Sequence, residues 1–316
     1  AAYMTTAWVL TEGMAGTQNQ CVALAHAAGF APEIKTIRLR QPWKMMTPWL
    51  RGFSPTALVT GSSVLAPPWP DVIIASGRKA IAPALWIKKQ SKGATKLVIV
   101  QSPVIKSDAF DLVIVPRHDR YRAPNAFEIT GALSVVDKDV LGAAKEKWSA
   151  ALASLPNPRV AVLIGGDSRT HKMTPRATRH WLAQLQGLLR KGLGLMLTLS
   201  RRTPPAAREI LQQGLMQEQN VLFWDGSGDN PYHGFLAWAD VILVSEDSVS
   251  MACEAISTGK PVYLLPMAGG SKRFARFHDY IVEQGFARWF DGDVAPFSYT
   301  PPDDLQRAAK VVQELL

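Results

Sequence analysis

The sequence predicts an α/β protein with two domains, each built from a parallel sheet covered by helices. Three observations support this fold class. Short apolar runs rich in Val, Ile and Leu alternate with helical patterns along the chain, which is typical of parallel α/β layers. The 316 residues suit two domains of about 150 residues each. With 47% hydrophobic and 19% charged residues, the chain can bury cores of ordinary size, which excludes wholesale disorder.

The first half of the chain contains one such series. Residues 7–10 are predicted to form a strand, followed by the loop 12–16 and a helix over 17–28 that Gly29 ends as a C-terminal glycine. Further strands are expected at 34–39, 71–75, 96–100 and 111–115, with helices over 80–89 and 137–154.

The second half begins a fresh series after the proline-containing break at 155–158. Strands are predicted at 159–164, 194–199, 220–224, 240–244 and 261–265, with helices between them. The break marks the boundary between the predicted domains 1–154 and 155–316. The last segment, 303–316, is predicted to be an amphipathic helix that can pack back on the N-terminal domain.

Charge and cysteine content narrow the classes of function. Lys and Arg number 35 against 26 acids, a net charge of +9 that favours anionic partners. Cys21 and Cys253 lie far apart and no Cys/His spacing suits a metal, so we expect neither a disulfide framework nor a metal site. No apolar run approaches the roughly 18–20 residues of a membrane span, and the start of the sequence, residues 1–6, lacks the pattern of a signal peptide, so a cytoplasmic protein is expected.

Two basic zones lack acidic residues. Between Glu33 and Asp71, cations alternate with aromatic residues, which suits the interface of an anionic membrane; the alternative is a loop whose Trp residues pack in the core. The members are Lys35, Arg38, Arg40, Lys44 and Arg51 with Trp43, Trp49, Phe53 and Trp69. The second zone, between Asp167 and Glu209, contains nine Lys or Arg residues. No nucleic-acid-binding signature accompanies this charge, so nucleic acid is not an expected partner.

Loops after two strands of the second series carry groups that suit phosphate. Gly165-Gly166-Asp167-Ser168 allows close approach of the backbone and free N–H groups to an anion; the alternative is a tight turn. Ser200-Arg201-Arg202-Thr203 offers arginines for bidentate contact with a diphosphate; the alternative is an exposed basic loop before a helix. Ligands of open α/β sheets bind at this end of the strands.

The segment 244–261 combines a buried strand, a polar loop and a helix. Asp247 or Ser248 can cap the helix, and N–H groups near Ser248 and Ser250 can hold a phosphate. Glu254 lies two turns beyond Asp247 on roughly the same helix face, where its carboxylate can accept hydrogen bonds from both ribose hydroxyls. The alternative assigns Ser248 to capping and Glu254 to a surface ion pair.

This arrangement of strand, loop, Ser248, helix, Glu254 and Gly259-Lys260-Pro261 resembles the donor half of GT-B glycosyltransferases. Several segments in order also resemble the "elongate mitochondria" (ELM-type) family named for plant mitochondrial fission. These are 13–24, 75–78, 101–103, 111–119, 165–168, 200–203 and 245–261. The resemblance implies two Rossmann-like domains that face each other across a cleft. The loop Gly13–Gly16 is not Gly-x-Gly-x-x-Gly and no Tyr-x-x-x-Lys pair is present, so the sequence does not favour a dinucleotide-dependent epimerase.

The GT-B resemblance implies a metal-independent transferase without a cofactor, in which a nucleotide-sugar is the co-substrate. The acceptor would be an envelope lipid or glycan at the inner face of the cytoplasmic membrane. The candidate substrate-binding residues are Gly16, Gln20, Ser76, Arg78, Gly166, Asp167, Ser168, Ser200, Arg201, Arg202, Asp247, Ser248, Ser250 and Glu254. The loop 225–230 is expected near the nucleobase.

An inverting transfer needs a general base for the acceptor hydroxyl. Glu12, in the first loop, is the first candidate, and His118 and Asp119 are the alternatives. Ser76 and Arg78 either line the acceptor side or start the next helix. The competing hypothesis is a non-catalytic membrane-associated adaptor that retains the fold.

Overall fold

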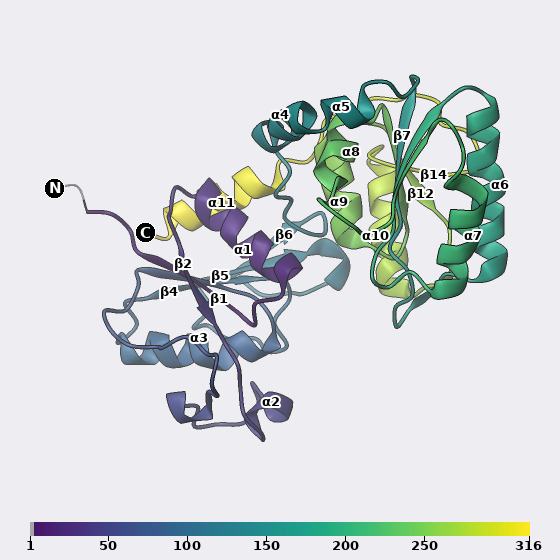
Figure 1. Ribbon diagram of the computed structural model, residues 1–316. Helices are drawn as coiled ribbons and strands as arrows, with labels where there is room; N and C mark the ends of the chain where they lie inside the picture. Colours follow the sequence, from purple (N-terminus) through teal and green to yellow (C-terminus); the bar gives the residue numbers. More distant parts are fainter. Residues whose placement is uncertain (1–2) are drawn as a thin grey trace. The chain divides into compact units, whose positions relative to one another are not determined.

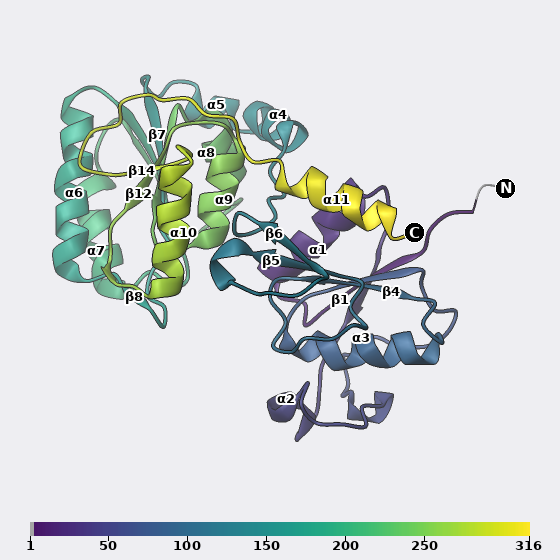
Figure 2. The ribbon, with the colours of Figure 1, turned by 180° about the vertical axis from the view of Figure 1, so that it is seen from behind.

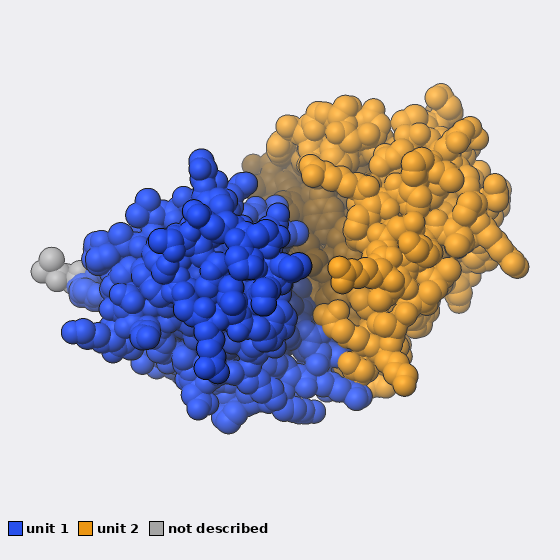
Figure 3. Space-filling view, turned by 90° about the horizontal axis from the view of Figure 1, so that it is seen from below, with its two compact units in different colours: residues 1–135, 303–316 blue, residues 136–302 orange. Residues whose placement is uncertain are grey.

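The computed structural model describes residues 3–316 and divides the chain into two compact units. Unit 1 consists of residues up to Val135 together with Asp303–Leu316, and unit 2 is Val136–Pro302 (Figure 3). Each contains a six-stranded sheet in which all strands are parallel (Figures 1 and 2). The predicted parallel α/β architecture is therefore confirmed.

The sheet of unit 1 has the strand order β2-β1-β3-β4-β5-β6. Its strands are β1 (Ala7–Thr11), β2 (Glu33–Thr36), β3 (Val72–Ala75), β4 (Lys96–Val100), β5 (Leu112–Pro116) and β6 (Ala126–Ile129). Helices α1 (Ala15–Ala27) and α11 (Asp304–Glu314) lie side by side on one face and α3 (Arg78–Gln90) covers the other (Figures 1 and 2). Both faces of the central strands are consequently buried, which explains their continuous apolar runs.

The last helix belongs to unit 1 for identifiable reasons. Ala308, Ala309 and Val312 of α11 are buried in the core that α1 also lines. The Asp304 carboxylate accepts a hydrogen bond of 2.9 Å from the backbone N–H of Thr130, and the Gln313 amide donates one of 3.0 Å to the carbonyl of Ala28. The C-terminal segment thus completes the core of the first sheet.

The sheet of unit 2 has the order β10-β9-β7-β11-β12-β14. Its strands are β7 (Arg159–Leu163), β9 (Gly194–Thr198), β10 (Val221–Trp224), β11 (Val241–Ser245), β12 (Val262–Leu265) and β14 (Arg288–Trp289), and a small second sheet pairs β8 (His171–Lys172) with β13 (Ala268–Gly269). Its helices are α4 (Lys138–Lys147), α5 (Ser149–Leu152), α6 (Pro175–Arg190), α7 (Pro205–Leu215), α8 (Tyr232–Trp238), α9 (Val249–Ser257) and α10 (Lys272–Glu283). Helices α6 and α7 cover one face of the sheet, and α8 and α9 the other (Figure 1).

The single helix predicted over 137–154 is two helices, and both lie in unit 2 rather than in the first domain. Trp148 separates α4 from α5, and its indole ring packs directly against Gly234 of α8. A Cβ atom at position 234 would lie only 2.5 Å from the indole, so this contact requires glycine. The Trp238 indole N–H also donates to the carbonyl of Lys145, at 3.0 Å. These contacts attach α4 to α8, upstream of the boundary predicted from the prolines.

Among residues 3–316, no helix is both long and apolar enough to cross a bilayer.

Candidate functional site

The carboxyl ends of four adjacent strands in unit 2 bring the predicted donor-site loops together. Residues 165–168 follow β7, residues 200–203 follow β9, residues 225–230 follow β10 and residues 246–248 follow β11. Since these strands neighbour one another in the order β10-β9-β7-β11, the loops share one edge of the sheet. This is the edge at which open parallel sheets bind ligands.

Asp247 connects the loops at this edge of the sheet through its carboxylate. Its carboxylate accepts hydrogen bonds from the Ser245 hydroxyl, at 2.6 Å, and from the backbone N–H of Gly166, at 3.1 Å. It also forms an ion pair of 2.8 Å with the Arg202 guanidinium, and its side chain is fully buried. The Ser245 hydroxyl in turn accepts the N–H of Gly165 at 2.8 Å. Asp247, predicted to contact substrate, therefore has its oxygens occupied within the protein.

The loops after β7 and β9 are also joined directly. The hydroxyls of Ser200 and Thr203 both donate to the carbonyl of Gly165, each at 2.6 Å. The N–H of Asp167 donates to the carbonyl of Arg202 at 2.9 Å. The Asp167 carboxylate accepts the N–H of Met173 at 2.8 Å. The predicted residues Ser200 and Asp167 thus hold loops in place, whatever they contact in addition.

Gly166 permits this close packing. A Cβ at Gly166 would collide with the backbone carbonyl of Arg202 and the N–H of Thr203. We therefore expect Gly166→Ala to lower the free energy of unfolding by about 2–3 kcal/mol, because neither loop backbone can yield without breaking its hydrogen bonds. Urea unfolding checks this. Gly142→Ala is the control, since its Cβ would meet no atom within 4 Å; equal stability of both variants would contradict the packing role.

A cavity of about 480 Å³ opens beside this network. Its volume falls within the range of roughly 300–1,000 Å³ of small-molecule sites. The apolar and aromatic part of the lining consists of Ile164, Leu199, Trp224, Tyr232 and Met251, and the polar part of Thr198, Ser200, Arg201, Arg208, Asp225, Gly226 and Asn230. A lining that combines aromatic side chains with two arginines suits a ligand with a planar ring and a diphosphate.

The two arginines of the cavity differ in their partners. The Arg208 guanidinium donates to the carbonyl of Ser200 at 3.2 Å. Arg201 is exposed, and within residues 3–316 its side chain makes no hydrogen bond or ion pair. Arg201 is therefore the cavity cation whose charge is not used by the fold.

Glu254 lies in α9, one turn after the cavity residue Met251, and faces Tyr232. Burial raises the pKa of Glu254 to about 7, while the interaction with the Tyr232 hydroxyl acts in the opposite direction. That hydroxyl is buried, and among the described residues no partner meets the geometry of a hydrogen bond, so the contact with Glu254 is a loose one. An unliganded Glu254 is consequently a poorly solvated carboxyl with unused acceptor capacity.

The remaining residues of the 244–261 motif have three different environments. Ser248 caps α9 by accepting the N–H of Met251 at 3.2 Å, while Ser250 is exposed. The Lys260 ammonium donates to the carbonyls of Leu236 and Ala237, at 2.6 and 2.8 Å, and burial lowers its pKa to about 8. Lys260 therefore fixes the end of α8.

One group at this edge has no counterpart in the sequence analysis. Glu246 lies between two buried histidines, with its Oε2 atom 3.8 Å from Nε2 of His171 and 3.7 Å from Nδ1 of His278. Burial lowers the pKa of both histidines and raises that of Glu246. The three residues come from β8, α10 and the loop after β11, so no sequence spacing indicates them.

In unit 1, the candidate bases occupy different environments. Glu12 follows β1, is 30% exposed and forms an ion pair of 2.8 Å with Lys79. His118 is buried beside Asp119, with 3.6 Å between Nε2 of His118 and Oδ1 of Asp119, and Asp119 accepts a hydrogen bond of 2.6 Å from the Ser102 hydroxyl. Glu12 is thus the candidate more open to an acceptor.

The residues predicted to line the acceptor side have internal partners. Gln20 accepts from the Gln101 amide at 3.0 Å, and the Ser76 hydroxyl donates to the carbonyl of Val100 at 2.6 Å. Arg78 donates to the carbonyls of Lys44, Met45 and Thr47. Neither Gly16, which is exposed, nor Ser168 lines a described cavity.

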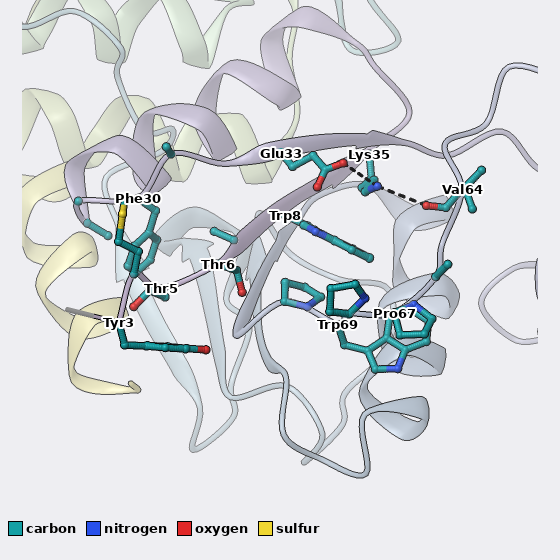
Figure 4. Close-up of a pocket in the computed structure, with 18 residues that line it drawn as sticks. Tyr3, Thr5, Thr6, Trp8, Phe30, Glu33, Lys35, Val64, Pro67 and Trp69 are labelled. Carbon is teal, nitrogen blue, oxygen red and sulfur yellow. Dashed lines mark hydrogen bonds and ion pairs between the residues drawn. The ribbon is translucent and has the colours of Figure 1, made fainter. Parts of the chain in front are cut away.

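A larger cavity than the one in unit 2 lies in unit 1. It measures about 910 Å³ and lies where β1 and β2 begin, with Trp8, Phe30, Pro67 and Trp69 around it (Figure 4). Lys35 is paired there with Glu33 at 2.8 Å. Because it lies at the amino ends of the strands, this cavity is not at the ligand-binding edge of the sheet.

The aromatic residues of the first basic zone fall into two groups, one packed against the core and one exposed. Trp43, Phe53 and Trp69 pack against the core, with Trp43 and Phe53 edge-to-face at 5.4 Å. Trp49 is 61% exposed. Packing in the core thus accounts for most of these rings but not for Trp49.

Comparisons with known proteins agree with this architecture. A family model described as mitochondrial fission ELM1 matches residues 15–316. Over 78% of its own length, the chain is 32% identical to the mitochondrial fission protein ELM1 of Arabidopsis thaliana. The matched region covers 64% of the Arabidopsis protein, so the chain spans less than two thirds of this relative. It is 26% identical to the uncharacterized protein RP120 of Rickettsia prowazekii over 97% of both chains.

Solved structures show the same fold at low identity. The UDP-GlcNAc 2-epimerase of Methanocaldococcus jannaschii is 12% identical over 99% of both chains, with a TM-score of 0.61, and its complex with UDP-GlcNAc and UDP gives 0.53. A glycosyltransferase from Rickettsia africae is 12% identical over 99% of this chain and 93% of its own, with a TM-score of 0.50. At this identity the likeness concerns the fold alone, and it confirms the predicted GT-B type.

Proposed function

Given that the chain belongs to the mitochondrial fission ELM1 family, we propose that it is a GT-B-type glycosyltransferase that moves a sugar from a nucleotide-sugar to an envelope lipid or glycan. The observation that carries this proposal is the unit 2 cavity, in which Arg201 and Arg208 lie beside Trp224 and Tyr232. The structural neighbours that were solved in complex with UDP-GlcNAc or UDP support a nucleotide-sugar as the ligand class.

In the proposed binding mode, the nucleobase packs against Trp224 and the diphosphate lies between Arg201 and the N-terminus of α9, where Ser250 is exposed. The ribose hydroxyls donate to Glu254. Arg201 and the helix N-terminus stabilise the charge that develops on the departing diphosphate, so the proposed transfer needs no metal.

Glu12 is the proposed general base in unit 1. It is partly exposed at the carboxyl end of β1, and Lys79 holds its carboxylate by the ion pair. It would take the proton of the acceptor hydroxyl as that oxygen bonds to the sugar carbon and the diphosphate leaves. The acceptor is proposed to come from the inner face of the cytoplasmic membrane, which the basic zone Lys35–Trp69 would contact.

A non-catalytic adaptor remains a second candidate because several motif residues have roles in the fold. Asp247, Ser200 and Lys260 all bind other parts of the protein, so an adaptor would keep them without any ligand. Arg201 and Glu254 distinguish the two candidates. Neither an unpaired cation nor a poorly solvated carboxyl stabilises the fold, whereas both would serve a nucleotide.

Turnover of donor tests the proposal. The protein is incubated with UDP-, GDP-, CMP- and dTDP-sugars and with a bacterial envelope lipid extract as the source of acceptor. The release of the nucleotide is measured, which is CMP for the CMP-sugar and a nucleoside diphosphate for the others. We expect release from one class, reduced roughly 10²-fold or more in Glu12→Gln, which should still show donor-induced thermal stabilisation. Glu128→Gln, an exposed glutamate of the same unit, is the control. Isomerised sugar without nucleotide release would indicate an epimerase, and no response to any donor would favour the adaptor.

A further inference from the structure

Three apolar side chains are exposed together at the tip of unit 1. Met45, Met46 and Trp49 lie in and just after α2 (Trp43–Met46), and their exposed fractions are 69%, 45% and 61%. Soluble proteins seldom expose contiguous large apolar side chains unless they form a contact surface. Trp favours the headgroup level of a membrane, and the flexible side chain of Met adapts to irregular apolar surroundings.

The charged side chains of the segment that contains this tip all have one sign. No acidic residue occurs between Glu33 and Asp71, and Arg38, Arg40, Lys44 and Arg51 are all exposed. Within residues 3–316 the side chains of Lys44 and Arg51 form no hydrogen bond or ion pair. Their charge is therefore available to an anionic surface. By contrast, Lys35 is already neutralised by Glu33 at the separate cavity of Figure 4.

The tip is attached to the body of unit 1 by hydrogen bonds and ring contacts. Arg78, the first residue of α3, donates to the carbonyls of Thr47 at 2.6 Å, Lys44 at 3.0 Å and Met45 at 3.2 Å. Beneath it, Trp43 packs on Phe53, which packs on Trp86 of α3 with 6.1 Å between ring centroids. A segment that is already ordered loses little conformational entropy when it binds.

The anchor also sets the position of the tip relative to the sheet. Arg78 follows β3 at the carboxyl edge, the edge at which β1 ends and Glu12 follows. The apolar tip is thus attached at the ligand-binding edge of the first sheet rather than at the amino ends where the large cavity lies. A partner bound by the tip would lie at the side of unit 1 that carries the proposed base.

We propose that Met45, Met46 and Trp49 insert into the headgroup region of an anionic bilayer, with Lys44 and Arg51 binding the lipid phosphates and Arg78 acting as the positioning residue. This extends the acceptor side of the proposed function, but the binding itself requires no catalysis. The partner is a lipid surface with net negative charge.

Vesicle co-sedimentation tests the proposal. The full chain should bind vesicles of phosphatidylglycerol and phosphatidylcholine at least tenfold more strongly than pure phosphatidylcholine vesicles, and added salt should weaken the binding. Lys44→Glu/Arg51→Glu should lose tenfold or more, and Met45→Ser/Trp49→Ser should lose a similar factor. Brominated lipids should quench tryptophan emission of the wild type more than that of Trp49→Phe.

Matched controls separate this surface from general effects. Lys89→Glu/Lys92→Glu makes the same change of charge at the other end of α3, and Met216→Ser removes an exposed apolar side chain from unit 2; both should bind like the wild type. Nucleotide-sugar stabilisation should persist in every tip variant, so failure here is distinguishable from failure of the transferase proposal. Equal binding of both vesicle types, or unchanged binding by the tip variants, would overturn the inference. Binding of single-stranded RNA that is lost in Lys44→Glu/Arg51→Glu, without vesicle binding, would assign the surface to nucleic acid instead.

Discussion

Replacing Glu254 by glutamine is expected to raise the free energy of unfolding by about 3 kcal/mol at pH 8. Burial raises the pKa of this carboxyl to about 7 from a value of 4.5 in the unfolded chain. The folded state therefore holds the proton more tightly, and Glu254 costs stability progressively as pH rises from 4.5 to 7, with the full cost above pH 7. A shift of this size corresponds to roughly 3 kcal/mol, and glutamine avoids it.

Urea unfolding at two pH values measures the effect. The advantage of Glu254→Gln should shrink to less than about 1 kcal/mol at pH 5, where the buried carboxyl is protonated. Glu283→Gln, an exposed glutamate of the same unit, should be neutral at both pH values. A stability difference that does not change with pH would show that Glu254 is not a strained carboxylate.

The ionisation of Glu254 should also control the affinity of the protein for a nucleotide. If Glu254 accepts hydrogen bonds from the ribose, it must be ionised to accept both, so nucleotide affinity should rise about tenfold between pH 6 and pH 8. In Glu254→Gln the affinity should be lower and independent of pH over this range. Titration calorimetry at pH 6, 7 and 8 measures both. Pairing of higher stability with weaker binding would identify Glu254 as a residue retained for ligand binding rather than for the fold.

Replacing Asp247 by alanine should have the opposite effect on stability, a loss of about 3 kcal/mol or more. The buried carboxylate binds the Ser245 hydroxyl and the N–H of Gly166 and pairs with Arg202. Its removal leaves these donors without acceptors and separates the loops after β7, β9 and β11. Nucleotide binding should be lost as well, because the cavity depends on the position of these loops.

Urea unfolding together with nucleotide titration checks this expectation. Asp229→Ala is the control: it breaks only an exposed pair with Lys147, at 3.3 Å, which should contribute little. A variant Asp247→Ala that folds with wild-type stability but no longer binds nucleotide would mean that Asp247 contacts the ligand directly, as the sequence analysis supposed.

The sequence predicted the parts of the fold whose signal is local. Central strands such as β3 and β11 are buried on both faces, so their continuous apolar runs identified them. Strand β6 was missed because it lies at a sheet edge, only partly buried, and contains Glu128. The Trp148 contact with Gly234, which attaches α4 to unit 2, joins positions that no pattern relates.

In the candidate site too, some residues could be predicted from local sequence and others could not. Arg201 and Glu254 could be proposed from their places after a strand and along a helix, and the structure gives neither a role in stabilising the fold. The bonds that join Ser76 to Val100, Ser200 to Gly165 and Asp247 to Gly166 could not be foreseen, because each connects positions 24 to 81 residues apart. Their residue types suit a ligand and a neighbouring backbone equally well, and only tertiary packing decides which they bind.

The most direct test of the central claim is equilibrium titration of the protein with UDP, GDP, CDP and dTDP, in parallel with Arg201→Ala. We expect binding of one nucleoside diphosphate, with affinity reduced about tenfold or more in Arg201→Ala and no change in the free energy of unfolding. Arg179→Ala, which removes an exposed arginine of α6, should bind like the wild type. Equal affinity in Arg201→Ala, or no binding of any of the four, would contradict the assignment of this cavity to a nucleotide-sugar.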